Sequence, residues 1–138
     1  MKKEFSKEWK SSKKPSKQRK YRFNAPLHIK QKFMRVHLSK ELRKKYEKRN
    51  IGLKKGDRVT ILRGQFKKKS GKVERIDLKK SAVYVTGIEL IKKDGSKVLL
   101  HMDPSNLMIT ELNLEDKKRT QTLEKKGKKE DKKEAKKK

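Results

Sequence analysis

The residues that indicate chemistry in this sequence are basic side chains interleaved with aromatic ones. One cluster consists of Lys17, Arg19, Lys20, Tyr21, Arg22 and Phe23, and another of Arg63, Phe66, Lys67, Lys68, Lys69 and Lys72. Lysine and arginine neutralise phosphates, and aromatic rings stack on exposed bases. We therefore expect nucleic-acid binding, with Tyr21, Phe23 or Phe66 as the stacking ring. Packing on the folded body is an equal alternative for Phe23, whereas base contact is favoured for Phe66 at a loop tip.

No set of residues has the spacing of an active site or a metal centre. The three histidines, His28, His37 and His101, lie far apart in the sequence, so packing or surface roles are favoured over metal ligation. Four aspartates fall at expected turns or strand ends, where carboxylates cap the backbone: Asp57, Asp77, Asp94 and Asp103. The segment from Gly64 to Gly71 lacks the ending of a phosphate-binding P-loop. We expect no enzymatic activity, no cofactor and no small-molecule substrate.

The net charge of the chain requires an anionic partner. The 138 residues include 45 Lys and Arg against 17 Asp and Glu, which gives +28, and only 30% of residues are hydrophobic. Such a composition fits one small core with extended segments, and nucleic acid is favoured over a membrane surface as partner. The longest apolar run has four residues (82–85), so we expect no membrane insertion. The absence of cysteine fits a cytoplasmic protein.

Residues 1–53 predict a basic arm followed by a helical extension. Residues 1–20 are polar, with Phe5 and Trp9 as the large apolar residues, and we expect an extended arm without a core. Residues 21–53 predict two helices, one starting near Asn24 and one at Ser39. Their apolar stripes are Ile29, Phe33 and Val36, then Leu38, Leu42 and Tyr46. This part holds 19 basic and 4 acidic residues, so it is the larger electrostatic anchor.

Residues 54–112 predict a small, mostly-β body. Five strands are expected at 58–63, 72–77, 81–86, 97–102 and 107–112, with 88–91 either continuing the third or forming a bent extra strand. Asp94-Gly95 is a hairpin turn signal, and residues 103–106 predict a turn or one 3₁₀ turn. The pattern favours a closed antiparallel barrel of five strands. Residues 113–138 form a Lys-rich tail, whose first half permits a short helix without an apolar stripe to hold it.

The stretch from Lys54 to Lys80 resembles a KOW motif, which occurs in ribosomal proteins and transcription elongation factors. The matching elements are Gly56-Asp57-x-Val59, Arg63-Gly64 and Gly71-Lys72-Val73. The flanks resemble the archaeal and eukaryotic form of the universal large-subunit ribosomal protein L-twenty-four (L-twenty-six in eukaryotes), with the archaeal form the better match. They are residues 18–28, 38–46, 104–107 and 112–114. The resemblance covers about residues 17–120. In one departure, Phe66-Lys67-Lys68 replaces the usual Tyr-Lys-Gly tip.

This resemblance implies an SH3-like barrel of five strands with a basic N-terminal extension, and a cytoplasmic, ribosome-bound protein. It implies binding to large-subunit rRNA early in subunit assembly, neighbouring ribosomal proteins as partners, and a position near the polypeptide exit tunnel. The residues expected to contact RNA are Lys17, Arg19, Lys20, Tyr21, Arg22, His28, Lys30, Lys32, Arg35, Arg43, Lys44, Arg63, Gly64, Phe66, Lys67, Lys68, Lys69 and Lys72. The alternatives are a KOW-type transcription elongation module, for which residues 1–53 are too short, and an RNA-modifying enzyme.

Overall fold

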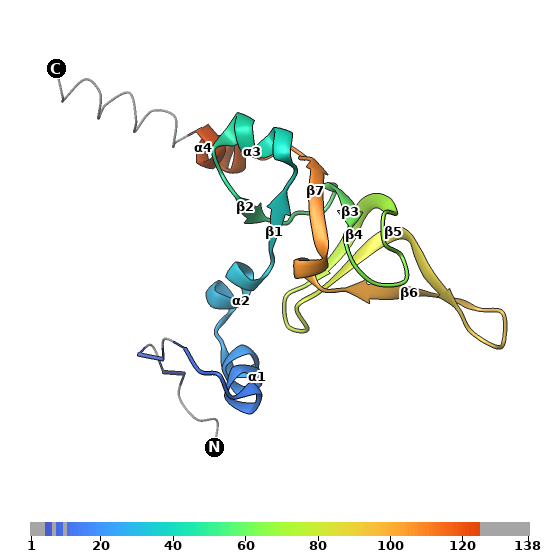
Figure 1. The fold of residues 1–138 in the computed structure, drawn as a ribbon, viewed down its shortest axis with the longest axis horizontal. Coiled ribbons are helices and arrows are strands. Elements are labelled where there is room, and N and C mark those ends of the chain that lie inside the picture. Colours follow the sequence, from blue (N-terminus) through green and yellow to red (C-terminus); the bar gives the residue numbers. More distant parts are fainter. Residues whose placement is uncertain (1–4, 7, 10, 125–138) are drawn as a thin grey trace.

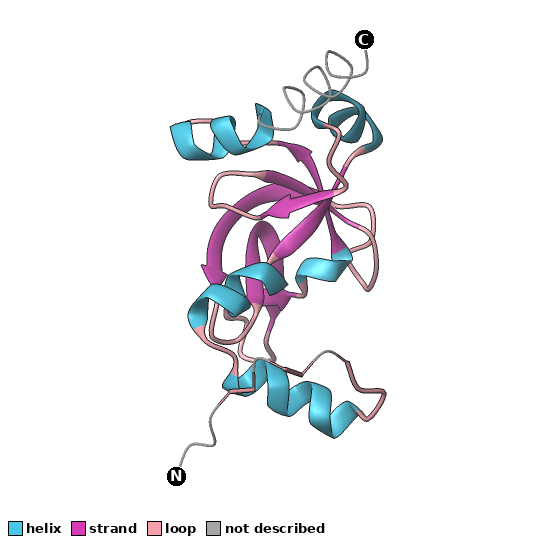
Figure 2. Cartoon of the chain, turned by 90° about the vertical axis from the view of Figure 1, so that its left-hand side faces the viewer, coloured by secondary structure: helices cyan, strands magenta, loops and turns pink. Residues whose placement is uncertain are grey.

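Seven strands form one mixed sheet, with helices at its two ends (Figure 1, Figure 2). The computed structural model describes residues 5–6, 8–9 and 11–124, and the strand order is β2-β1-β7-β3-β4-β5-β6. All neighbouring pairs are antiparallel except β1 and β7, which are parallel. Within the described residues no pairing joins β2 to β6. The mostly-β class is confirmed, whereas closure into an antiparallel barrel is wrong.

The predicted strands after residue 54 are present. They are β3 (Arg58–Ile61), β4 (Ser70–Asp77), β5 (Ala82–Ile91), β6 (Lys97–Met102) and β7 (Leu107–Glu111), with a 3₁₀ turn at Pro104–Asn106. Residues 88–91 continue β5 past Gly87, which adopts a φ of +80° where the pairing register with β6 shifts. At the hairpin tip, Asp94 Oδ1 accepts hydrogen bonds from the Ser96 backbone and hydroxyl groups, which lower the pKa of Asp94.

Two further strands come from the segment that was expected to be helical throughout. The elements are α1 (Pro15–Asn24), α2 (Leu27–Phe33), β1 (Arg35–Leu38), α3 (Lys40–Tyr46) and β2 (Asn50–Gly52). Val36 and Leu38 therefore lie on a strand and not on helical stripes. Both side chains point to the core from alternate positions of β1, and Leu38 lies opposite Ile109 of β7. The expectation of an extended arm is also wrong for residues 15–20, which lie in α1.

Alternate residues of the central strands make the core. Six of them are at most 1% exposed: Val36 and Leu38 of β1, Val59 and Ile61 of β3, and Leu107 and Ile109 of β7. Each such side chain contributes about 1.5–3 kcal/mol on burial. Val73, Val83, Val85 and Ile88 extend this core through β4 and β5. The alternate positions of β1 and β3 face outward, and at two of them Arg35 and Arg58 are exposed to solvent.

The C-terminal helix α4 (Lys117–Glu124) is anchored to the body, contrary to the expectation that nothing would hold it. Leu123 is 2% exposed, and Arg119 is 6% exposed. Helices α3 and α4 lie at the same end of the molecule (Figure 1). There the ammonium group of Lys48, which follows α3, donates a hydrogen bond to the Thr122 carbonyl. The rest of the predicted tail, residues 125–138, lies outside the described residues.

The anchor of α4 is a buried ion pair between Arg119 and Asp57, the residue before β3. The guanidinium Nη1 lies 2.6 Å from Oδ1 of Asp57, and Nη2 lies 2.7 Å from Oδ2. Arg119 also donates to the carbonyls of Asn113 and Gly52, at 2.8 and 3.2 Å. The Asp57 carboxylate accepts two more bonds, from the backbone N–H groups of Lys54 and Asn113. This group, which we call the Asp57 cluster, joins β2, β3, the end of β7 and α4.

We expect the Arg119→Met substitution to destabilise the protein by about 3–5 kcal/mol, because it leaves the Asp57 carboxylate buried without its cation. Urea unfolding, followed by far-ultraviolet circular dichroism, measures the change. Lys118→Met removes the same charge from an exposed position of α4 and is the control, with an expected change within about 0.5 kcal/mol. A loss below about 1 kcal/mol for Arg119→Met contradicts the importance of this pair.

Candidate nucleic-acid interface

The surface of α1 and α2 carries positive charge without any acidic residue. Residues 9–40 contain eleven basic and no acidic side chains. On α1 the predicted contacts Lys17, Arg19, Lys20 and Arg22 are all exposed. Because no acidic residue in this segment neutralises these charges, this part of the chain presents exposed positive charge that suits a polyanion.

The aromatic residues of the first cluster have different environments. The Tyr21 ring is half-buried and stacks on Trp9, with ring centroids 4.1 Å apart and an interplanar angle of 23°. Phe5 and Phe33 lie against the same ring, at 4.9 and 6.1 Å. Phe23 is 81% exposed, so the alternative that it packs on the folded body is wrong. Phe5 and Trp9 were not predicted as site residues, although Trp9 is the single tryptophan of the chain.

The predicted contacts between α1 and β2 are mostly free for a ligand. His28, Lys32, Arg35 and Lys44 are exposed, and Lys30 is half-buried. Arg43 differs, because its Nε donates a 2.8 Å hydrogen bond to the Leu38 carbonyl. Its guanidinium thus helps to hold the junction of β1 and α3. Its role as an RNA contact stays a prediction.

The second cluster lies in the loop between β3 and β4. Arg63, Lys67, Lys68, Lys69 and Lys72 are exposed. Phe66, however, is only 9% exposed and belongs to the hydrophobic core, and the ammonium of Lys69 lies 5.0 Å from its ring centroid. The expected partial exposure of Phe66 at the loop tip is therefore wrong, and its contact with a base stays a prediction. An aromatic residue among lysines resembles a stacking ring in sequence, but here it anchors the loop to the body.

The altered tip of this loop keeps the backbone of a glycine turn. Lys68, at the position where the resembling family has glycine, adopts a φ of +71°, and its N–H donates to the Ile61 carbonyl at 2.8 Å. A non-glycine residue in this left-handed region costs roughly 1–2 kcal/mol. The loop thus exchanges some stability for one more exposed positive charge.

The three glycines of the motif differ in why their positions require glycine. A Cβ atom on Gly71 would lie 2.6 Å from the Thr86 carbonyl oxygen, so glycine allows β4 and β5 to approach closely. At Gly56, which has a φ of +90°, a Cβ atom would lie 2.7 Å from Asn113 of the Asp57 cluster. Gly64 also has a φ of +90°, but no atom lies within 4 Å of such a Cβ. Of the three, Gly64 is therefore the one whose backbone is open to a phosphate.

The comparisons with known proteins show which family the chain belongs to. A family model that describes the eukaryotic ribosomal proteins L26 and their archaeal counterparts of the L-twenty-four type matches residues 12–126. The chain belongs to this ribosomal protein family. The match extends beyond the expected residues 17–120 at both ends and includes all of α1 and α4. Arg119 and the rest of the Asp57 cluster therefore lie within the part of the chain that matches the family.

Three curated relatives are each named "Large ribosomal subunit protein uL24". The protein of Methanothrix thermoacetophila is 50% identical over 105 residues, which are 76% of this chain and 90% of the relative. The proteins of Methanosphaera stadtmanae and Methanosarcina barkeri are 46% and 44% identical, over 115 and 114 residues. In both cases the match covers 83% of this chain and 98% of the relative.

Membership of this family confirms three expectations. The chain is a structural ribosomal protein and not an enzyme, the resemblance to the archaeal form holds, and the protein is bound to ribosomes in the cytoplasm. The part of the chain that the structure describes contains no helix long and apolar enough to cross a membrane. The same described residues contain no group of three or more side chains suited to hold a metal ion.

We expect Lys68→Gly to stabilise the protein by about 1 kcal/mol, because glycine adopts the left-handed turn without steric cost. Lys67→Gly is the matched control, because it also removes one lysine charge from the loop tip. Lys67, which precedes Lys68, does not have a positive φ. This control should be destabilising by roughly 0.5–1 kcal/mol. Thermal unfolding of both variants measures the difference. Equal effects of the two substitutions would show that residue 68 is not strained.

Proposed function

We propose that this protein is a structural constituent of the large ribosomal subunit that binds large-subunit rRNA. Family membership supports the ribosomal role, and the relatives' printed name supplies the large subunit. The observation that carries rRNA binding is the acid-free segment 9–40, whose basic side chains on α1 and α2 are largely exposed. Duplex and looped RNA both present closely spaced phosphates, and such a surface neutralises them.

The mechanism is charge neutralisation on a rigid frame, without catalysis. Phosphate contacts supply the affinity, and the sheet sets the relative positions of the basic surfaces. We propose that residues 54–112, with β3 to β7, act as the SH3-like unit implied by the resemblance, and that 1–20, 21–53 and 113–138 act as its basic extensions. We further propose that the protein joins the subunit early in assembly, beside neighbouring ribosomal proteins and near the polypeptide exit tunnel.

The alternative of a transcription elongation module receives no support from the fold. Such proteins were expected to carry a separate α/β domain before the KOW motif. Here residues 35–38 and 50–52 form β1 and β2 of the same sheet as the motif, and β1 pairs directly with β7. The segment before the motif thus serves as part of one body and as a basic surface.

We expect binding of the full chain to large-subunit rRNA to depend steeply on salt. With on the order of eight phosphate contacts, log K should fall by about six to seven units for a tenfold rise in salt concentration. Filter binding over a range of potassium chloride concentrations measures this slope. Small-subunit rRNA is the control, and its affinity for the protein should be lower than that of large-subunit rRNA by a factor of about ten or more. A slope near zero, or equal binding of both RNAs, contradicts the proposal.

The location of the charge can be tested separately from its amount. The triple variant Arg63→Gln, Lys67→Gln, Lys72→Gln removes three exposed charges from the β3–β4 loop region. It should reduce the salt slope by roughly two to three units, because three phosphate contacts are lost. The control Lys92→Gln, Lys93→Gln, Lys97→Gln removes three exposed charges at the β5–β6 hairpin. A similar reduction in both variants would show that net charge alone determines binding.

A further inference from the structure

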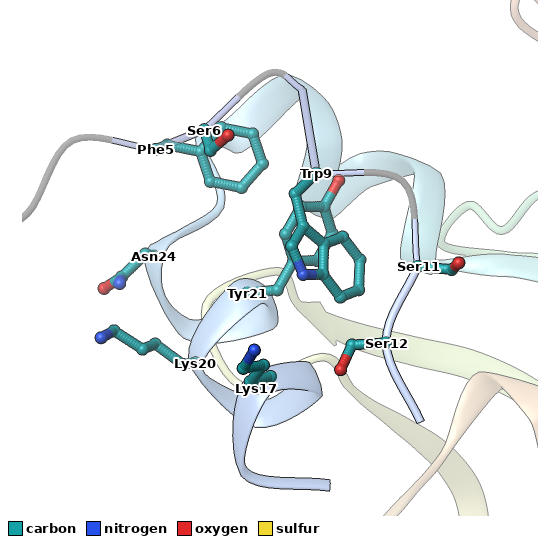
Figure 3. Close-up of a pocket in the computed structure, with 9 residues that line it drawn as sticks. All are labelled: Phe5, Ser6, Trp9, Ser11, Ser12, Lys17, Lys20, Tyr21 and Asn24. Atoms are coloured by element: carbon teal, nitrogen blue, oxygen red, sulfur yellow. The ribbon is translucent and has the colours of Figure 1, made fainter. Parts of the chain in front are cut away.

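An aromatic pocket lies between the N-terminal segment and α1 (Figure 3), and its rings take no part in the charge neutralisation proposed above. Its volume is about 390 Å³, within the range of sites that enclose small ligands. Nine residues line it. Phe5 and Trp9 come from the segment before α1, and Lys17, Lys20, Tyr21 and Asn24 come from α1 itself. The segment before α1 and α1 itself thus form one open pocket together.

The aromatic walls of this pocket hold one another in place. Trp9 stacks on Tyr21, Phe5 lies 4.9 Å from the Tyr21 centroid with a tilt of 39°, and Phe33 of α2 meets Tyr21 edge-on at 6.1 Å. Aromatic pairs of this kind contribute about 0.5–1.5 kcal/mol each beyond burial. The rings are therefore preorganised, although α1 has no buried residue of its own.

The polar groups of the pocket select the charge of its ligand. Lys17, Tyr21 and Asn24 are spaced at i, i+4 and i+7, so they lie along one face of α1. Lys20 also lines the pocket and adds a second ammonium group (Figure 3). None of the nine lining residues carries a carboxylate. Aromatic cages often bind quaternary ammonium ligands, but these lysines would repel such a cation. The ligand that fits this pocket is therefore planar and anionic.

A nucleotide satisfies all of these requirements. Its base is a flat π-system that stacks on tryptophan, tyrosine or phenylalanine, and its phosphate pairs with ammonium groups. The amide of Asn24 offers one donor and one acceptor group to a base edge. A base within a duplex cannot enter, because both its faces are stacked on neighbouring bases. The ligand class is therefore an unpaired nucleotide.

We propose that this pocket binds the base of one unpaired rRNA nucleotide, with the neighbouring phosphate at Lys17 and Lys20. This inference rests on the proposed RNA-binding function and adds a site of base recognition to it. The site differs from the β3–β4 loop, where Phe66 is buried and no aromatic ring is exposed. The pocket thus provides a specific anchor within a surface that otherwise contacts the RNA backbone.

Trp9 reports on this site directly, because it is the only tryptophan of the chain. The full protein is titrated with an eight-nucleotide oligoadenylate, and with an abasic sugar–phosphate oligomer of the same length and charge. We expect the oligoadenylate to quench Trp9 fluorescence and to bind more tightly than the abasic oligomer, by about fivefold to a hundredfold. Equal quenching and equal affinity would overturn the pocket, since they would show a contact by charge alone.

The Phe5→Leu variant removes one aromatic wall but keeps an apolar side chain, and we expect it to lose most of the preference for oligoadenylate. Tyr46→Leu is the matched control on α3, outside the pocket, and should retain the preference. Circular dichroism and unfolding of both variants confirm that they fold. A preference unchanged in Phe5→Leu overturns the proposal. If the unsubstituted protein binds rRNA with the expected salt slope but shows no base preference, the pocket proposal alone is wrong. If it shows neither rRNA binding nor a base preference, the proposed function is refuted as well.

Discussion

The buried pairing of Asp57 with Arg119 is the interaction on which the rest of this structure depends. In a chain of net charge +28, these are the only charged residues counted as buried among those that the structure describes. Asp57 lies just before β3 and receives four donors, from the backbone before it, from the end of β7 and from α4. A carboxylate without these partners would be strongly unfavourable in the interior. The cluster therefore ties the two flanks of the chain to one sheet.

Among the residues that the structure describes, every lysine and arginine except Arg119 is at least partly exposed. β1 and β2 attach the N-terminal helices along one edge, next to β7, and the Asp57 cluster attaches α4. The Lys54 ammonium adds an exposed pairing with Asp116, which lowers the pKa of that carboxyl. Because the core is small, such polar ties at its margin have a large share in uniting the flanks with the sheet.

Sequence reasoning predicted the strands after residue 54 because their apolar residues alternate and their turns carry glycine, as at Asp94-Gly95. It failed for β1, since a run as short as Arg35–Leu38 satisfies helical and strand spacing alike, and only pairing with β7 decides between them. The buried role of Arg119 was not predicted, because nothing in the sequence distinguishes it from the other Lys and Arg residues, 45 in all. The lysine neighbours of Phe66 indicated an RNA contact, but the core lies directly beneath that loop. The basic side chains of α1 were placed correctly on an exposed surface, although the helix itself was missed.

The burial of Phe66 divides the two basic clusters into different kinds of anchor. The β3–β4 loop exposes cations and the open backbone of Gly64, but no aromatic ring, so it is suited to pairing with phosphates and not to stacking on a base. Such contacts position a protein on RNA without reading its sequence. The α1 region combines cations with the stacked rings of Phe5, Trp9 and Tyr21, which are groups that distinguish an unpaired base from a helix. If the protein binds rRNA as proposed, affinity and base recognition would thus be carried by separate parts of one chain.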